Sequence, residues 1–370
     1  MSHPYSFGLE EEYFLVDAQS KSVARAMPDG FLQEAKDALD GKVAGEFLQS
    51  QIEIITPPHT DMAAAQDELR SLRRRLGEIA GRHGLALFAA GTHPTASWER
   101  ARQSEGARYD NVMDDLQMIG QRNMLCGLHV HVELPAPDRR VDVMNRMLPF
   151  LPLFIALSTS SPFWRSYQTG LKGYRLAAYD ELPRTGIPEL FRTNEEYDAY
   201  INALVAAGVM PDSSYIWWAI RPSLKHPTLE LRAPDCCTRL DDAIAIAALY
   251  RSLARRLTRD PWKNWDLTAV SRAIIVENKW RAQRYGMAGT FVKIEGDGAI
   301  AVGDFVDQVV HEVTPDARAL GCLAELEHCR VIAERGTSAD MQIRLYEEFA
   351  SHPEHGLKAV AEWIAATTLQ

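Results

Sequence analysis

Cysteine is scarce in this sequence and follows no regular pattern. The 370 residues contain five cysteines, two of them adjacent. An odd number without regular spacing does not form a disulfide framework, and two neighbouring thiols cannot chelate zinc by themselves. We therefore expect free, buried thiols in a reducing compartment. They are Cys126, Cys236, Cys237, Cys322 and Cys329.

Long apolar runs are also missing. The first residues show no basic stretch followed by an apolar core, so no secretory signal peptide is expected. Runs such as residues 243–249 are far shorter than the roughly 20 residues that a membrane-spanning helix needs. The sequence thus predicts a cytoplasmic protein with no membrane partner.

An excess of positive charge is absent as well. Lys and Arg number 40 against 50 Asp and Glu, which gives a net charge of -10. This balance argues against nucleic acid as a partner, and an anionic substrate such as a nucleotide would need local arginine, lysine or metal. The composition is otherwise that of an ordinary globular protein, and the length fits either two domains or one large sheet with covering helices.

Several common catalytic motifs are missing too. The sequence has no Gly-x-x-x-x-Gly-Lys-Ser/Thr phosphate loop and no Gly-x-Gly-x-x-Gly after a predicted strand. It has no Gly-x-Ser-x-Gly elbow, and no Ser-His-Asp or Cys-His signature. A nucleotide, if one binds, must therefore be held by metals on a sheet rather than by a glycine loop.

The stretch that organises the chain is residues 7–17, which place three consecutive glutamates inside an apolar run. Tyr, Phe, Leu and Val favour a strand, and side chains along a strand alternate between its faces. Glu10 and Glu12 therefore share one face, whereas Glu11 lies on the other with Leu9 and Tyr13. Two like charges on one face are tolerated if a cation lies between them or if the face is fully solvated.

The same pattern recurs in three more predicted strands, within residues 51–56, 128–134 and 228–233. In each strand, apolar residues occupy one face and polar or ionisable residues the other. The four strands together indicate an antiparallel sheet with an apolar core face and an ionisable face. The residues on the ionisable face are Gln51 and Glu53; His129, His131 and Glu133; and Thr228, Glu230 and Arg232.

Predicted strands lie mostly in residues 1–235 and predicted helices in residues 236–370, without regular βαβ alternation. This order predicts the α+β class, with helices on the apolar face of an antiparallel sheet and the ionisable face left open as a cleft. A hairpin around residues 222–227 is expected to bring Arg221 near Glu230 and Arg232.

A long helix is predicted over residues 60–81, and its basic residues are expected to lie on a solvated outer face. Residues 158–173 form a hydroxyl-rich loop that could hold substrate oxygens, although a plain loop is the favoured interpretation. The basic residues of the helix are Arg70, Arg73, Arg74 and Arg75.

The ionisable face has the composition of a site for divalent cations. Histidine among several carboxylates suits Mg²⁺ or Mn²⁺ better than zinc, whose sites are usually built on Cys and His. Glu46 joins this set only if a turn separates it from Glu53, because the two positions differ by an odd number. A solvated face with an ordinary ion pair between Glu230 and Arg232 is the alternative, but recurrence on four strands favours the metal site.

Two or three divalent ions held there could clamp nucleotide phosphates and offset the charge that develops during phosphoryl transfer. Arg232, next to Glu230, is placed to meet a phosphate or a carboxylate with its planar fork.

Several segments together resemble the signature blocks of the carboxylate–amine ligases of the glutamate–cysteine ligase type 2 group. The resemblance spans about residues 5 to 350, and the blocks are specific jointly rather than singly. The segments are residues 7–12 (FGLEEE), 45–46 (GE) through 53–56 (EIIT), 126–131 (CGLHVH), 229–232 (LELR) with Asp235, and 277–282 (ENKWRA) with 284–286 (RYG).

The resemblance implies a glutamine-synthetase-like fold, in which one domain over residues 1–370 carries its active site on a curved antiparallel sheet. Carried over position by position, it implies that the metal ligands are Glu10, Glu12, Glu46, Glu53, His129 and Glu230. The candidate catalytic residues are then Arg232, Arg221 and His131. The candidate cofactor-binding residues are Arg232, Lys279 and Arg281. The match departs at His131, where the glutamate–cysteine ligases carry asparagine.

The activity implied is an ATP-dependent ligation that needs Mg²⁺ or Mn²⁺. The γ-carboxylate of glutamate, or of a similar substrate, attacks the γ-phosphate of ATP, and an amine such as cysteine then displaces phosphate from the acyl phosphate. The protein contributes positioning and electrostatic stabilisation rather than a nucleophile. The expected partners are small molecules, and the mostly helical tail suggests a homodimer.

Two other functions fit the same residues. A metal-dependent hydrolase would use the same carboxylates to activate water. A nucleotide-binding regulatory protein with a decayed active site is disfavoured, because every ligand-type position is still filled.

Overall fold

The computed structural model describes residues 4–370, apart from the side chains of Arg100 and Arg108. Its centre is a seven-stranded sheet in the order β2-β3-β1-β5-β9-β8, with β4 paired to the second half of β1 on the same edge as β5. All of these pairings are antiparallel, which confirms the predicted α+β class. The strands are β1 (Phe7–Asp17), β2 (Val43–Gly45), β3 (Gln51–Ile55), β4 (Leu85–Phe88), β5 (Leu128–Glu133), β8 (Ile220–Pro222) and β9 (Thr228–Leu231).

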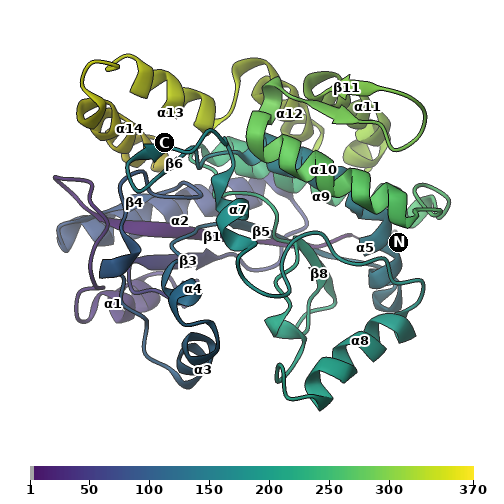
Figure 1. The fold of residues 1–370 in the computed structure, drawn as a ribbon, viewed down its shortest axis with the longest axis horizontal. Helices are drawn as coiled ribbons and strands as arrows, with labels where there is room; N and C mark the ends of the chain where they lie inside the picture. The colour runs from purple at the N-terminus through teal and green to yellow at the C-terminus, as the bar shows by residue number, and fades with distance from the viewer. Residues whose placement is uncertain (1–3) are drawn as a thin grey trace.

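Helices α9 to α14 lie along one side of this sheet, and α3 and α8 project from the other side (Figure 1). The helices are α1 (Phe31–Ala38), α2 (Met62–Arg82), α3 (Ala107–Leu116), α4 (Met118–Gln121), α5 (Arg140–Met147), α6 (Leu151–Ser158), α7 (Tyr174–Tyr179), α8 (Asn194–Ala206), α9 (Leu240–Arg259), α10 (Ala269–Tyr285), α11 (Val302–Leu320), α12 (Leu323–Arg335), α13 (Ser338–Glu347) and α14 (Pro353–Thr368). Two small hairpins complete the fold: β6 (Phe163–Trp164) with β7 (Tyr167–Gln168), and β10 (Thr290–Val292) with β11 (Ala299–Ala301).

β1 is the strand on which the sheet is built, because its 11 residues are long enough to pair with β3, β4 and β5. The register places Glu12 opposite Glu53 and Glu10 opposite His129. One strand further on, His131 lies opposite Glu230. The predicted alternation of faces is therefore confirmed. Strand register alone gathers carboxylates and imidazoles of distant segments into one strip, which consists of Glu10, Glu12, Glu53, His129, His131 and Glu230.

The apolar face of the sheet is covered by α2, α9 and α14, which contact β4 and β5. Leu9, Val130 and Leu231 point into this core and are almost fully buried. An apolar run also forms the segment 137–158, which contains α5 and α6. In the described chain this is the one helical stretch that is long and apolar enough to cross a bilayer, but 83% of its most apolar window is buried inside the protein.

Arg73 corrects the prediction that all four arginines of α2 face solvent. Its side chain is only 1% exposed, and Nη2 lies 2.6 Å from Oε1 of Glu11. Its Nε donates a hydrogen bond of 2.8 Å to Oε2 of the same carboxylate. Glu11 is the glutamate of β1 that faces the core, so the buried carboxylate requires a buried counter-charge. Arg74, one residue further along the helix, is exposed as predicted.

Removing the charge of Glu11 should therefore affect stability first. We expect Glu11→Gln to lower the free energy of unfolding by about 3–5 kcal/mol, because it leaves the Arg73 guanidinium buried without a counter-ion. Denaturant unfolding measures the change. Arg74→Met is the matched control on the same helix, since Arg74 makes only an exposed pair with Glu78 at 3.9 Å and should cost less than about 1 kcal/mol. Equal costs for the two variants would contradict the interpretation.

Candidate functional site

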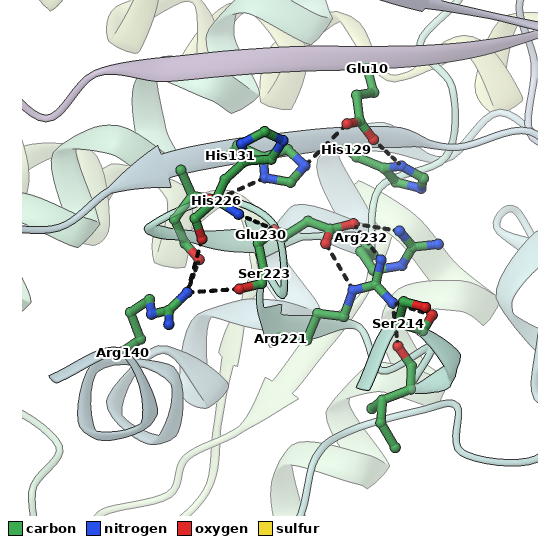
Figure 2. Close-up of polar contacts among 12 residues, drawn as sticks. Glu10, His129, His131, Arg140, Ser214, Arg221, Ser223, His226, Glu230 and Arg232 are labelled. Carbon is green, nitrogen blue, oxygen red and sulfur yellow. Dashed lines mark hydrogen bonds and ion pairs between the residues drawn. The ribbon is translucent and has the colours of Figure 1, made fainter. Parts of the chain in front are cut away.

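The ionisable face brings together side chains from β1, β3, β5 and β9. Nδ1 of His129 lies 3.2 Å from Oε2 of Glu10, and its Nε2 lies 3.7 Å from Oε1 of Glu12. His129 therefore stands between the two glutamates of β1. Figure 2 shows Glu10 reaching from β1 toward both His129 and His131 of β5.

Two overlapping groups on this strip have the geometry of cation sites. In each group, one ligand atom from each of three residues lies within 4.8 Å of the others. This separation suits oxygen and nitrogen ligands around a single divalent ion. His129 is common to both groups, and its Nε2 is buried with no hydrogen-bond partner. The groups are Glu10, His129 and Glu230, and Glu12, Glu53 and His129.

The carboxylates at this strip repel one another electrostatically. Burial, together with the nearby Glu12 charge, raises the pKa of Glu46 from an ordinary value of 4.5 to about 8. Burial and the charge of Glu46 also raise the pKa of Glu53 well above its ordinary value. Glu46 follows β2 directly, and the turn that the sequence required between Glu46 and Glu53 is present in residues 47–50. Cations would relieve this repulsion, so the residues present fit divalent metal ions.

Glu230 behaves differently because two arginines flank it. Arg221 donates from Nε to Oε2 of Glu230 at 2.8 Å, and Arg232 donates from Nη1 to Oε1. Burial disfavours the charged form, yet the two guanidinium groups hold the pKa of Glu230 well below its ordinary value. The hairpin of β8 and β9 places Arg221 directly opposite Glu230, as predicted. Nε of Arg232 is buried and unpartnered, so this side chain retains a free donor.

His131 extends the strip toward β9. Its Nδ1 lies 2.9 Å from Oγ1 of Thr228, and its Nε2 lies 3.3 Å from Oε1 of Glu10. Burial opposes protonation, but the neighbouring carboxylates of Glu10 and Glu230 raise the pKa of His131 overall. The His226 ring lies edge-on to it at 6.1 Å, in the turn that joins β8 to β9.

Two predicted nucleotide contacts lie outside this strip. Nζ of Lys279 pairs with Asp180, at the end of α7. Arg281 donates from Nε to the carbonyl oxygen of Thr290 at 2.6 Å, on the small hairpin of β10 and β11. Both arise from α10, and neither lines the cavities described below. Their role as cofactor contacts stays a prediction.

Two cavities adjoin the strip, one at each end of it. The histidine cavity, of about 360 Å³, is mostly apolar and includes Glu10, His131 and His226 in its lining. The arginine cavity, of about 160 Å³, includes Glu12, Glu46, Arg175 and Arg232. Because β1 runs from Gly8 at the first cavity through Glu10 to Glu12 at the second, the acids lie between the two.

Sequence reasoning missed Arg175 in α7. Its side chain is 2% exposed and lies against Gly127, where a Cβ atom would clash with the guanidinium. Nη1 donates to backbone carbonyl oxygens, among them that of Pro234 at 3.1 Å, while Nε is buried without a partner. In the described part of the chain, no carboxylate lies within ion-pair distance of it. Arg175 lies outside any strand, so the alternation of side chains along a strand does not predict where it is placed.

The hydroxyl-rich loop serves the interior of the protein. The Ser161 hydroxyl donates to Oδ2 of Asp235 at 2.7 Å, and the Ser160 backbone N–H donates to the same oxygen at 3.0 Å. Both serines are fully buried. The favoured interpretation of a plain loop therefore agrees with the structure.

Comparison with known proteins identifies relatives along nearly the whole chain. The model of glutamate–cysteine ligase family 2 matches residues 6–361. A protein of Bradyrhizobium diazoefficiens named "Putative glutamate--cysteine ligase 2" is 53% identical over 365 residues, which cover 99% of this chain and 84% of that protein.

Solved structures show the same fold at low identity. A glutamate–cysteine ligase of Francisella tularensis in complex with AMP aligns with a TM-score of 0.73 and 14% identity, over 99% of this chain and 89% of that one. A bifunctional glutathione synthetase of Pasteurella multocida aligns with a TM-score of 0.72 and 17% identity, over 98% of this chain but only 52% of its own length. At these identities the comparison concerns the fold, and it confirms the glutamate–cysteine-ligase-like architecture.

Proposed function

Because the chain belongs to glutamate–cysteine ligase family 2 and is a carboxylate–amine ligase, we propose that it uses ATP to join the γ-carboxylate of glutamate, or of a similar acid, to an amine. One observation carries this proposal. A strip of carboxylates and imidazoles lies between two cavities of different chemistry, and two arginines line one of them. A reaction that joins two substrates through a phosphorylated intermediate needs such an arrangement.

The metal ligands proposed are the six residues that the family resemblance implies. Mg²⁺ or Mn²⁺ bound there would neutralise phosphate charge and polarise the transferred group. The unpartnered Nε2 of His129 and the mutual repulsion among the acids support this choice. The six residues are Glu10, Glu12, Glu46, Glu53, His129 and Glu230.

The reaction proceeds in two balanced steps. A carboxylate oxygen of the first substrate attacks the γ-phosphorus of ATP, the bond to the bridging oxygen breaks, and ADP leaves. The amine nitrogen then attacks the acyl carbon, the bond from that carbon to the phosphate oxygen breaks, and phosphate leaves as the nitrogen loses a proton. Neither step needs a protein nucleophile, which agrees with the absence of a Ser-His-Asp or Cys-His signature from the sequence.

The side chains of the protein orient the reacting groups and hold charge. Glu230 fixes Arg232 and Arg221 in place, and Arg232, whose Nε is buried without a partner, lines the arginine cavity. A preorganised guanidinium stabilises negative charge on the transferred phosphoryl group without reorganising during the reaction. His131, held by Thr228 and Glu10, is placed to contact the same phosphates from the opposite end of the strip.

The two cavities differ in the ligand that each suits. The histidine cavity is larger and mostly apolar, with the His131 and His226 rings in its wall, so we assign the nucleoside to it. The arginine cavity presents two guanidinium groups that have buried, unpartnered donors, so we assign the carboxylate substrate and the amine to it. Arg175 would then meet the α-carboxylate, because its Nε has no partner and no carboxylate of the described chain lies within ion-pair distance of it.

The test is a measurement of ADP formation with Mg²⁺, ATP, glutamate and hydroxylamine, a small amine that traps acyl phosphates as hydroxamates. We expect hydroxamate that depends on both glutamate and ATP. Phosphate release that ignores glutamate and amine would instead favour the metal-dependent hydrolase. Failure to form hydroxamate across a set of dicarboxylic and amino-acid substrates would overturn the proposed chemistry.

A charge-conserving substitution at Arg232 separates geometry from charge. We expect Arg232→Lys to lower kcat/KM by about 10²–10³-fold, since one ammonium cannot keep the contact with Glu230 and present a second fixed donor. Steady-state kinetics with hydroxylamine measure the effect. Arg192→Lys on the exposed surface near α8 is the control and should retain full activity. Wild-type activity in Arg232→Lys would show that only the charge matters there.

A further inference from the structure

The arginine cavity has an apolar wall that the chemistry of glutamate does not require. Tyr109, Val112 and Leu116 of α3 all line it. Their spacing of three and four residues puts them on one face of the helix. None of the three is fully buried, so α3 turns an incompletely covered apolar stripe toward the cavity.

A second group of apolar side chains lines the same cavity from other segments. It consists of Tyr179 at the end of α7, Leu182 just after it and Trp217 just before β8. The Trp217 ring is held by the Arg184 guanidinium, which lies 5.3 Å from its centroid. The backbone N–H of Trp217 also donates to the carbonyl oxygen of Arg184 at 2.8 Å. Arg175 covers the Tyr179 ring at 5.6 Å. These contacts fix both rings in position before any ligand binds.

The apolar lining adjoins the groups that carry the chemistry. Glu12, Glu46 and Arg232 line the same cavity of about 160 Å³. Glutamate carries two carboxylates and an ammonium group, so it gains little from contact with tyrosine, leucine and tryptophan side chains. The apolar side chains are therefore left for the second substrate, whose amino group would point toward the acids.

We propose that the amine substrate carries a bulky apolar body, most favourably an aromatic ring, rather than the small thiol side chain of cysteine. This inference rests on the proposed function and names the class of its second substrate. A thiol would leave most of the apolar lining in contact with water. A ring would fill the space between α3 and Trp217, and burial of apolar surface is the main source of affinity in such a pocket.

The decisive experiment compares acceptors on the wild-type protein. Hydroxylamine, L-alanine, L-cysteine, L-phenylalanine and 2-phenylethylamine are each supplied with ATP, Mg²⁺ and glutamate, and kcat/KM is taken from ADP formation and confirmed by mass spectrometry of the amide. We expect at least one aromatic amine to exceed cysteine by about 10-fold or more, since a single methylene in an apolar pocket is worth about 10–200-fold. A preference for cysteine, or equal values for cysteine and both aromatic amines, would overturn the inference.

The hydroxylamine arm distinguishes the two possible failures. Hydroxamate formed alongside a cysteine preference would leave the proposed function standing and remove the inference about the acceptor. Absence of both hydroxamate and amide with every amine, for glutamate and for other dicarboxylic and amino acids, would remove both.

Variants locate the effect in the cavity. We expect Leu116→Ala and Trp217→Ala each to lower the ratio of kcat/KM for 2-phenylethylamine to that for hydroxylamine by about 5-fold or more. Leu116→Ala is included because it truncates a half-buried side chain and should fold even if Trp217→Ala does not. Trp265→Ala is the matched control, since Trp265 is 62% exposed in the connection between α9 and α10, outside the cavity lining. An unchanged ratio in Leu116→Ala would count against this placement of the acceptor.

Discussion

Glu10→Gln and Glu12→Gln should each lower ligase activity by more than about 100-fold while the protein stays folded. Loss of a partner that only orients a metal ligand already costs about 10–100-fold, so loss of a direct ligand should cost more. Glu10 contacts both His129 and His131, and Glu12 lies opposite Glu53 across the β1–β3 pair. Each variant is isosteric, so the expected loss comes from charge rather than from packing.

The measurement is steady-state ADP formation with glutamate and hydroxylamine at saturating Mg²⁺, together with a thermal unfolding curve for each variant. Glu78→Gln, at an exposed position of α2, is the control and should match the wild type in both measurements. A rate of ATP turnover close to that of the wild type in Glu10→Gln or Glu12→Gln would show that these glutamates do not hold the metal.

Glu11→Gln tests the alternation of faces on β1. Its carboxylate pairs with Arg73 in the core, so its variant should lose stability yet keep a milder activity defect in the molecules that remain folded. Activity is therefore compared well below the unfolding temperature of each variant. Equal losses of activity at Glu10, Glu11 and Glu12 would refute the assignment of the three side chains to opposite faces.

Much of the strip could be predicted because strand alternation is a local property. A period of two places Glu10 with Glu12 and His129 with His131 whatever the rest of the chain does. Pairing between strands then follows from the match of apolar faces, since a slip of one residue would bury the acids and expose the leucines. The turn between Glu46 and Glu53, required by their odd spacing, was inferred in the same way.

The residues that were missed depend on contacts between distant segments. Arg73 sits in a run of arginines on α2, and only the position of Glu11 in the core explains why this one is buried. Arg175 and Trp217 reach the arginine cavity because α7 and the segment before β8 pack beside the sheet. No periodicity in either segment reports that arrangement. Lys279 and Arg281 show the converse, because a family block in the sequence does not by itself place its side chains at the strip.

Glu46 links pH to the stability of the metal-free protein. Its pKa rises from an ordinary 4.5 in the unfolded chain to about 8 in the folded protein, because of burial and the charge of Glu12. Between these two values the folded protein holds a proton that the unfolded chain has released. Stability contributed by this group is therefore present below about pH 4.5 and falls as the pH rises toward about 8. Glu53, whose pKa is raised in the same direction, adds to the trend.

We expect the metal-free protein to lose stability between about pH 5 and pH 8, and Glu46→Gln to reduce that loss by about 1 kcal/mol or more, given 1.36 kcal/mol for each pKa unit. Mg²⁺ or Mn²⁺ binds the deprotonated carboxylates, so it should stabilise the wild type more at pH 8 than at pH 5. Denaturant unfolding at both pH values, in EDTA and in excess metal, measures the free energy of unfolding under all four conditions.

Glu78→Gln controls for the loss of one surface charge. His129, His131 and Glu53 are common to wild type and variant, so the difference between the two reports Glu46 together with its effect on Glu53. A variant with the same pH dependence as the wild type, or stabilisation by metal that does not depend on pH, would show that Glu46 is not held protonated by its neighbours and does not release that proton to a cation.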